Sequence, residues 1–223
     1  MPADLASAVH VQYALLMSAL MPLTIVQAGE PVLRRAARPL RHNEIRSREI
    51  RDLIQQMKET MYAAPGVGLA APQIGQGIQL AVIEDRPEYT RDWTPEQLAE
   101  RERRPVPFHV IINPKVTLIG EERVEAFEGC LSLENLMAMT PRAKKVRVDC
   151  LDEKGEPQVI EASGWYARIL QHEIDHLGGT MYVDRMYPRT LMTVDNFTRH
   201  WKGKTLEELK AAILEPAKTI SGS

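Results

Sequence analysis

The segment Gln171-His-Glu-Ile-Asp-His176 contains residue types that can bind a metal ion and move a proton. His172 and His176 are four residues apart, so on a helix their side chains lie on one face and can direct two imidazole nitrogens at one ion. Glu173 can act as a general base toward water without occupying a coordination position. Packing alone requires none of these three residues in this arrangement, so the pattern indicates a catalytic metal site.

A catalytic site of this kind normally has three protein ligands, and the third one distinguishes between enzyme classes. Tyr182 stands where the metzincin pattern would place a histidine, six residues after His176. Upstream, Cys130 lies in the stretch Glu128-Gly-Cys-Leu-Ser-Leu133, and its thiolate would suit a soft divalent ion. Cys150, inside an apolar run, is predicted to be a buried structural thiol. A thermolysin-like third ligand would lie downstream of His176, but the candidates there stand in no recognisable motif. They are Asp184, Asp195, His200 and Glu207.

Two helices are predicted from boundary signals and apolar spacing. The helix with both histidines has Ser163 as a candidate N-cap, helix-forming residues at 167–170, and a stop at Leu177-Gly-Gly179. A second helix is expected from Ser47 to Ala64, because its apolar residues recur at helical spacing. Those residues are Ile50, Leu53, Ile54, Met57 and Met61.

Short apolar or β-branched runs bounded by turn residues predict strands. They are Gln79–Ile83, Phe108–Ile112, Val116–Leu118, Val146–Leu151 and Gln158–Ile160. Asp152-Glu-Lys-Gly155 is expected to join the last two as a hairpin, because glycine accepts the positive φ angle that such a turn needs. We therefore expect a single α+β domain, with antiparallel sheets packed around a central metal-binding helix.

Two further segments predict features of the surface. Thr94-Pro-Glu-Gln97 has the residues of a capping box and indicates a short helix within an insertion from Asp85 to Pro107. The charge run Glu100–Arg104 is expected to be a solvated face, with a docking surface as the alternative. Thr205-Leu-Glu-Glu208 is a second capping box, which predicts a helix to about Leu214.

The overall composition excludes some classes of function. The chain has 223 residues, with 28 basic and 30 acidic side chains and a formal net charge of −2. This balance gives no general attraction to nucleic acid or to an anionic membrane. Two cysteines fit a reducing compartment. The apolar run at 11–23 is interpreted as an extension rather than a targeting signal, because residues 1–33 contain no Lys or Arg, and Met21 is an alternative start.

Gly66 and Gly68 also allow a second, weaker interpretation, which is a nucleotide-binding site. Gly66-Val-Gly-Leu-Ala-Ala71 is similar to a dinucleotide-binding turn, which needs a strand before it and a helix after it. A predicted helix and Pro65 precede this stretch, and Pro72 interrupts it. The glycines are better explained as positions where an extended substrate backbone approaches closely.

Three motifs together resemble those of the peptide deformylase family, in the family's order. They are Gly66-Val-Gly-Leu-Ala-Ala-Pro-Gln73, Glu128-Gly-Cys-Leu-Ser132 and Gln171-His-Glu-Ile-Asp-His176. The segments Gly164–Gln171 and Met186–Asn196, and the insertion, are especially similar to the subtype found in organelles and some bacteria. The resemblance spans about residues 24–196, flanked by an N-terminal extension (1–23) and a C-terminal extension with a short helix (197–223).

The resemblance implies removal of the formyl group from the N-terminal formyl-methionine of new polypeptides. It also implies that Cys130, His172 and His176 hold one divalent metal ion. Fe(II) is the first candidate for this ion, and Zn, Ni and Co are the alternatives. Glu173 would transfer protons, and the Gln73 side-chain amide and the Leu131 backbone N–H would stabilise negative charge on the formyl oxygen.

The resemblance also implies which residues line the substrate path. Val67, Gly68 and Gly129 would border the peptide, and Ile169 would contribute to the methionine pocket. Core packing is an equally good explanation for Val67 and Ile169. Two residues that support the site are expected to be Arg142, paired with Glu128, and Asp175, orienting a polar neighbour, with surface ion pairs as the alternative.

Two other functions remain open at this point. A zincin-like metalloprotease would use a downstream third ligand, and an inactive homologue would hold its metal only for structure. For a deformylase, the expected partners are N-formyl-methionyl nascent peptides and, as a further candidate, the ribosome. The expected compartment is the bacterial cytoplasm, with an organelle as the alternative.

Overall fold

The computed structural model describes residues 22–64 and 66–214 of the chain. The predicted N-terminal extension covers residues 1–23, and its residues 1–21, including Met21, lie outside the described residues. The strands are β1 (Gly68–Ala70), β2 (Leu80–Asp85), β3 (Val106–Cys130), β4 (Leu133–Leu151), β5 (Pro157–Ser163) and β6 (Met192–Thr193). The α-helices are α2 (His42–Ile45), α3 (Arg48–Ala63), α4 (Pro95–Glu100), α5 (Gly164–Leu177), α6 (Val194–His200) and α7 (Leu206–Leu214). The 3₁₀ helices are η1 (Pro31–Arg34), η2 (Ala71–Ile74), η3 (Pro87–Thr90), η4 (Tyr182–Asp184) and η5 (Pro188–Thr190).

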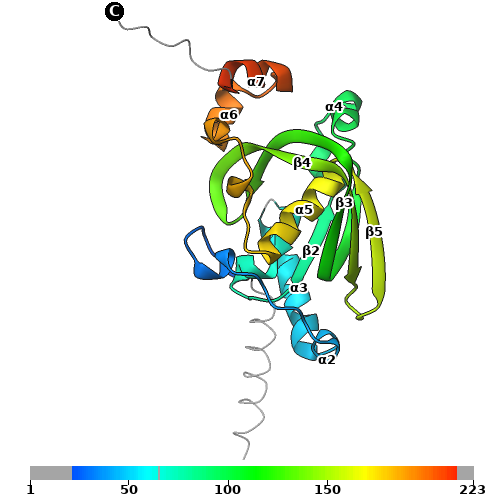
Figure 1. The fold of residues 1–223 in the computed structure, drawn as a ribbon. Helices are drawn as coiled ribbons and strands as arrows, with labels where there is room; N and C mark the ends of the chain where they lie inside the picture. Colours follow the sequence, from blue (N-terminus) through cyan, green and yellow to red (C-terminus); the bar gives the residue numbers. More distant parts are fainter. Residues whose placement is uncertain (1–21, 65, 215–223) are drawn as a thin grey trace, which may run out of the picture.

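The strands form one antiparallel sheet in the order β1-β2-β3-β4-β5, with β6 paired to β4. The first part of β3 pairs with β2, and the rest pairs with β4 as a long hairpin that ends at Cys130 and Leu133. Figure 1 shows this β3–β4 hairpin arching over α5, which lies in the middle of the molecule. The expected α+β domain with antiparallel strands around a central helix is confirmed.

The prediction of two separate strands at 108–112 and 116–118 is wrong, because both belong to β3. The register shifts between Ile112 and Lys115, where Asn113 adopts a positive φ of 51° and Pro114 follows. A bulge accepts a proline, which has no N–H for the ladder. The strand therefore continues through the Asn-Pro pair and changes its partner from β2 to β4.

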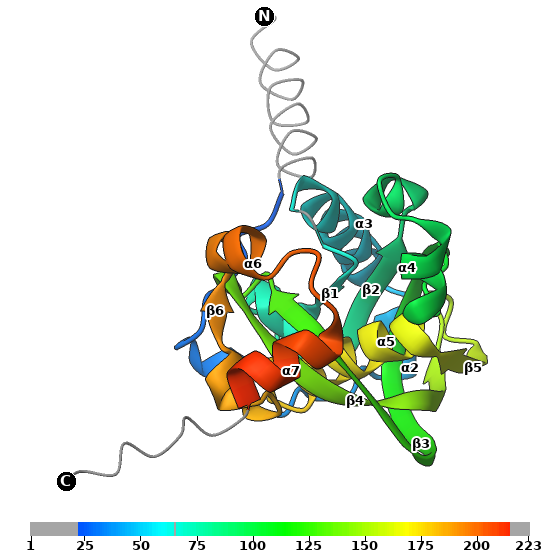
Figure 2. The ribbon, with the colours of Figure 1, turned by 90° about the horizontal axis from the view of Figure 1, so that it is seen from above.

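Two helices pack on opposite faces of the sheet. The buried residues of α3, such as Ile54 and Met57, form one apolar cluster with Val82 and Val110. The apolar residues of α5 join a second cluster with alternate residues of β2 and β3, including Ile83. Neighbouring residues of a strand point to opposite faces, which explains why the two clusters share strands. Figure 2 shows β2 between α3 and α5.

The helix boundaries confirm most of the capping predictions. Ser47 caps α3, where its hydroxyl accepts the Ile50 N–H at 3.2 Å. Thr94 and Gln97 form the predicted capping box of α4, and Thr205 and Glu208 form the one before α7. Ser163 occupies the N-cap position of α5, but its side chain makes no capping hydrogen bond.

The insertion departs from expectation in one respect. The charge run 100–104 is not uniformly solvated, since Arg103 is buried and forms a two-point ion pair with buried Asp85, both contacts at 2.8 Å. The Arg103 guanidinium also stacks on Trp93 and Trp165.

Two other features of the described residues bear on the sequence predictions. Cys150 is buried as predicted, and burial raises the pKa of its thiol to about 11. Within residues 22–64 and 66–214, no helix has both the length and the apolar character needed to cross a bilayer.

Candidate metal centre

Three side chains from two elements converge at one point beneath the β3–β4 hairpin. Cys130 is the last residue of β3, and His172 and His176 lie one turn apart on α5. One potential ligand atom from each lies within 4.8 Å of the other two. The Cys130 Sγ is 3.3 Å from the His176 Nε2. The structure thus brings together the three predicted metal ligands.

The downstream alternatives are not part of this group. Asp184 pairs with Arg34 and accepts the Met181 N–H, so its carboxylate is otherwise engaged. The other three candidates are on the C-terminal helices: Asp195 and His200 on α6 and Glu207 on α7.

A buried carboxylate orients the first histidine. Glu128, two residues before Cys130, accepts a hydrogen bond from the His172 Nδ1 at 3.0 Å, which leaves Nε2 for a ligand. Arg142 binds the same carboxylate at two points, at 2.9 and 2.8 Å, as predicted. Burial would raise the pKa of Glu128, but the hydrogen bonds from Arg142 and His172 outweigh it and hold this pKa well below its usual range. Glu128 therefore stays charged and keeps the ring of His172 in place.

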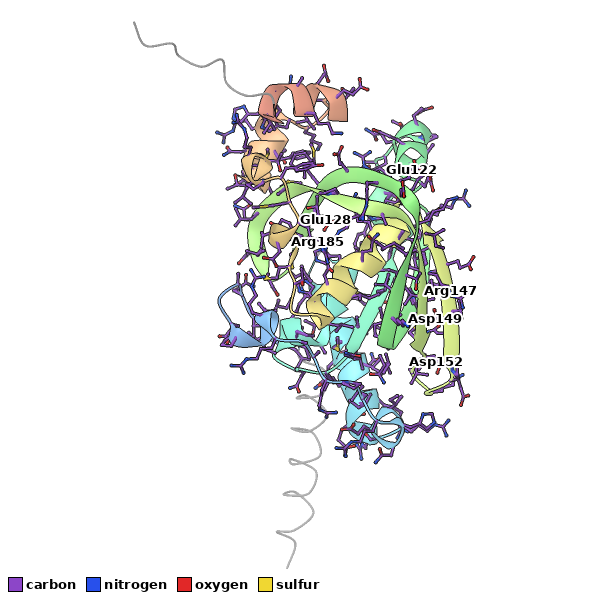
Figure 3. The ribbon with its side chains drawn as sticks, viewed as in Figure 1. Glu122, Glu128, Arg147, Asp149, Asp152 and Arg185 are labelled. Carbon is purple, nitrogen blue, oxygen red and sulfur yellow. The ribbon has the colours of Figure 1, made fainter. Side chains whose placement is uncertain are left out.

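The charged network continues outward from Arg142. Arg142 also contacts Asp175, which receives two hydrogen bonds from Arg185 at 2.6 and 2.7 Å. Arg142 is only 3% exposed, so its contacts with Glu128 and Asp175 are not the surface ion pairs that the sequence left open. Figure 3 shows Glu128 and Arg185 next to α5. Sequence reasoning missed Arg185 and Arg168. Arg168 stands four residues before His172, and this helical spacing could have indicated that the two side chains share a face of the helix.

Glu173 is 3% exposed, and burial raises the pKa of its carboxyl to about 7. Its Oε2 has no hydrogen-bond partner among the described residues. A Cβ atom at Gly68 would lie only 2.3 Å from the Glu173 Oε1, so residue 68 must be glycine for the carboxylate to occupy this place. A carboxyl with a pKa near neutrality can both accept and return a proton.

The Gln73 side chain lies next to the cysteine. Its Oε1 accepts the Ala70 N–H at 2.8 Å, which fixes the orientation of the amide. Its Nε2 is 3.5 Å from the Cys130 Sγ and 3.4 Å from the Ser132 Oγ. Leu131 lies in the turn between Cys130 and Ser132. The Gln73 amide therefore offers a preset donor beside the three converging ligands.

The remaining predicted site residues occupy different environments. Gly68 begins the edge strand β1, and Val67 precedes it. Gly129 adjoins Cys130 and pairs with Met137 of β4. Ile169 is 3% exposed and belongs to the core cluster on α5, so its place in a substrate pocket stays a prediction.

The surroundings of Gly66 do not match a dinucleotide-binding turn. The helix α3 precedes it, and the strand β1 leads into the short 3₁₀ helix η2 rather than into an α-helix. This agrees with the expectation from sequence.

The residues of the centre fit a divalent metal ion. One thiolate and two imidazoles are a usual donor set for zinc and related transition metals, and three protein ligands leave a position open. Burial lowers the pKa of His176, which favours the neutral ring that a metal requires. Glu128 orients the His172 ring, and the His176 Nε2 lies 3.3 Å from the Cys130 Sγ, so both histidines are placed to present a nitrogen to the ion.

Comparison with known sequences identifies relatives of this chain. A model of the family described as polypeptide deformylase matches residues 22–191. Peptide deformylase 1A, chloroplastic, of Solanum lycopersicum is 46% identical over 172 residues, which cover 77% of this chain and 62% of that protein. Peptide deformylase 3 of Streptomyces avermitilis is 43% identical over 193 residues, which cover 86% of this chain and 84% of that protein. This chain thus spans less than two thirds of the tomato protein but most of the bacterial one.

Solved structures agree with these relatives. The Met-Ala-Ser-bound class I type b peptide deformylase of Acinetobacter baumannii matches with a TM-score of 0.67 and 31% identity, covering 75% of this chain and 99% of that one. A peptide deformylase of Synechococcus elongatus in complex with actinonin matches with a TM-score of 0.61 and 38% identity, covering 74% and 79%. With a family model over most of its length and relatives above 40% identity, this chain belongs to the polypeptide deformylase family.

Proposed function

We propose that this protein is a metal-dependent amide hydrolase that removes the formyl group from the N-terminal formyl-methionine of new polypeptides. The observation that carries this proposal is the position of Glu173, a buried carboxyl with a pKa of about 7 beside the Cys130, His172 and His176 group. A purely structural metal site would not need such a group. Family membership supports the same reaction.

Cys130, His172 and His176 would hold the ion, for which Fe(II) is the first candidate and Zn, Ni or Co are alternatives. A divalent ion at this place supplies a Lewis acid that polarises the formyl group and makes water more acidic. The remaining chemistry belongs to the protein's own side chains.

Glu173 would take a proton from the attacking water and give it to the nitrogen that leaves with the peptide. Negative charge grows on the formyl oxygen during attack. The Gln73 Nε2, whose orientation is fixed by Ala70, and the Leu131 N–H would donate hydrogen bonds to it. The products are formate and a peptide with a free N-terminal methionine.

The substrate would bind as an added strand along β1, the edge of the sheet. Val67 and Gly68 would border it on one side and Gly129 on the other, with Ile169 contributing to the methionine pocket. Residues 24–196 would form the catalytic unit, with 1–23 and 197–223 as extensions. The substrate proteins would be nascent chains in the bacterial cytoplasm or in an organelle, and the ribosome is a further proposed partner.

The test is formate release from formyl-Met-Ala-Ser by protein prepared anaerobically with Fe(II) or with Ni(II). The acetylated peptide is the matched substrate control, and Cys130→Ala is the protein control. We expect release from the formyl peptide alone, and loss of both metal and activity in the variant. A metal-loaded chain that releases no formate would contradict the proposal, and a Cys130→Ala chain that keeps its metal would favour a zincin-like site.

A second variant tests the preset donor separately from the metal. Gln73→Leu should reduce kcat about a hundredfold or more, because losing one donor to the developing oxyanion has this effect in other hydrolases. Bound metal, measured by elemental analysis, should stay at the level of the parent. An unchanged kcat would remove Gln73 from the mechanism.

A further inference from the structure

Arg168 shares a face of α5 with the two histidine ligands. Positions 168, 172 and 176 are spaced by four residues, so they form one stripe along the helix. Arg168 is only 4% exposed, which is costly for a charged side chain unless its hydrogen bonds are satisfied. Its hydrogen bonds must therefore offset the cost of burying the charge.

The Arg168 guanidinium contacts both strands of the β3–β4 hairpin. Its Nη1 donates to the Glu128 Oε1 at 2.5 Å and to the Thr140 carbonyl at 2.8 Å. Its Nη2 donates to the Val124 carbonyl at 2.6 Å. Val124 and Glu128 are on β3, and Thr140 is on β4. One planar group on the helix thus binds three acceptors on the hairpin, which a lysine could not match.

The carboxylate that Arg168 binds is the one that orients His172. Each oxygen of Glu128 has two donors: Oε1 receives Arg142 and Arg168, and Oε2 receives Arg142 and His172. Glu128 also lies two residues before Cys130 on the same strand. Arg168 therefore contacts the segment that supplies the third metal ligand.

The two arginines at Glu128 lie on different elements. Arg142 is on β4, so its contact with Glu128 is internal to the hairpin, and it reaches α5 through Asp175. Arg168 is on α5, so its contacts join the hairpin to the helix. The separation between Cys130 and the two histidines depends on the contacts between the hairpin and α5, because Cys130 is on the hairpin and the histidines are on the helix. Arg168 makes three of these contacts.

We propose that Arg168 is a positioning residue that holds the β3–β4 hairpin on α5 and thereby sets the geometry of the Cys130, His172 and His176 ligand group. This inference rests on the proposed metal centre. It concerns the spacing of the ligands and not the formyl reaction itself, so it can be tested without turnover.

Cobalt substitution provides the test. In Co(II)-loaded protein, the thiolate-to-cobalt band and the ligand-field bands report on the Cys130 bond and the coordination geometry. Arg168→Met removes all three contacts and keeps an unbranched side chain. We expect altered cobalt bands and metal loss to a chelator that is about 10- to 100-fold faster, the range typical for residues that orient metal ligands.

Arg103→Met is the matched control. Arg103 is also a buried arginine, 9% exposed, with two 2.8 Å contacts to Asp85, and it belongs to no part of the proposed site. This variant should lower thermal stability but keep the cobalt spectrum and the chelation rate of the parent. If Arg103→Met accelerates metal loss as much as Arg168→Met, or if Arg168→Met changes neither readout, the positioning role is overturned.

Arg168→Lys keeps the inference testable if the methionine variant does not fold. A lysine retains the charge, but its single nitrogen cannot reproduce the positions of the two Arg168 nitrogens that bind these acceptors, so we expect cobalt bands and chelation rates between those of the parent and a disrupted site. A lysine variant identical to the parent in both readouts would overturn the proposal. A parent chain with no thiolate-to-cobalt band would instead overturn the metal centre itself.

Discussion

The helices α3 and α5 cover opposite faces of one sheet, yet they bury different kinds of residue. The buried residues of α3 are apolar apart from Thr60. Those of α5 include Arg168, Gln171, Glu173 and His176. Burial alone stabilises α3, whereas most polar groups on α5 need a partner on the facing strands. The Gln171 side chain, for example, binds both the N–H and the carbonyl of Ala143.

Glu173 differs from Arg168 and Gln171 on the same helix. Those two side chains bind groups on the hairpin, but the Glu173 Oε2 has no hydrogen-bond partner among the described residues. An unpaired buried carboxyl destabilises a fold, so its presence is best explained by catalysis. The comparison therefore predicts that changes on α5 reduce activity more than stability, and that changes on α3 do the reverse.

The largest effect is expected from Glu173→Gln, which replaces the carboxylate by a group of the same shape. We expect kcat to fall by about three orders of magnitude, since proton transfer by a positioned group contributes on this scale. The free energy of unfolding at neutral pH should stay the same or rise, because the amide removes a carboxyl whose ionised form is disfavoured by burial. Formate release and urea unfolding measure the two quantities, and a variant as active as the parent would remove Glu173 from its role.

Met57→Ala tests the apolar helix. Met57 is 0% exposed in the cluster between α3 and the sheet. Truncation should lower the free energy of unfolding by about 3 kcal/mol through lost burial and a residual cavity. The kcat, measured well below the unfolding midpoint, should match the parent. A fall in kcat without a loss of stability would show that α3 is not merely a packing element.

The smallest effect is expected at the helix starts, where both helices have a serine. Ser47→Ala should cost about 1 kcal/mol, because it removes the bond to the Ile50 N–H. Ser163→Ala should cost less, since that side chain makes no capping bond. Urea unfolding of the two variants side by side measures the difference. Equal costs would mean that the serine hydroxyl does not account for the stability of the start of α3.

The sequence was most informative where a local pattern determines the structure. The periodicity of 47–64 predicted α3, and the turn at 152–155 predicted the β4–β5 hairpin. The ligands Cys130, His172 and His176 followed from their chemical types together with the family motifs. In each case the information lies in a local stretch of sequence: one helix, one turn or one short motif.

The sequence was least informative about buried charges. Arg103 belongs to a run that looks solvated, and Arg168 lies in a stretch that looks simply helical. Each is buried because a distant partner meets it: Asp85 for Arg103, and Glu128, 40 residues away, for Arg168. No local pattern reveals such a partner. The continuation of β3 through Pro114 likewise depends on the two strands that flank it.

The wide separation of the site residues along the chain has a consequence for how the protein matures. Gln73 and Cys130 are 57 residues apart, and Cys130 and His176 are 46 residues apart. Bringing together residues so far apart along the chain requires long loops to close, which costs conformational entropy. Both histidines are on α5, so the group of three cannot assemble on a partly synthesised chain that lacks this helix. Metal uptake would then mark completion of the fold, and the bound ion would selectively stabilise finished molecules over incomplete ones.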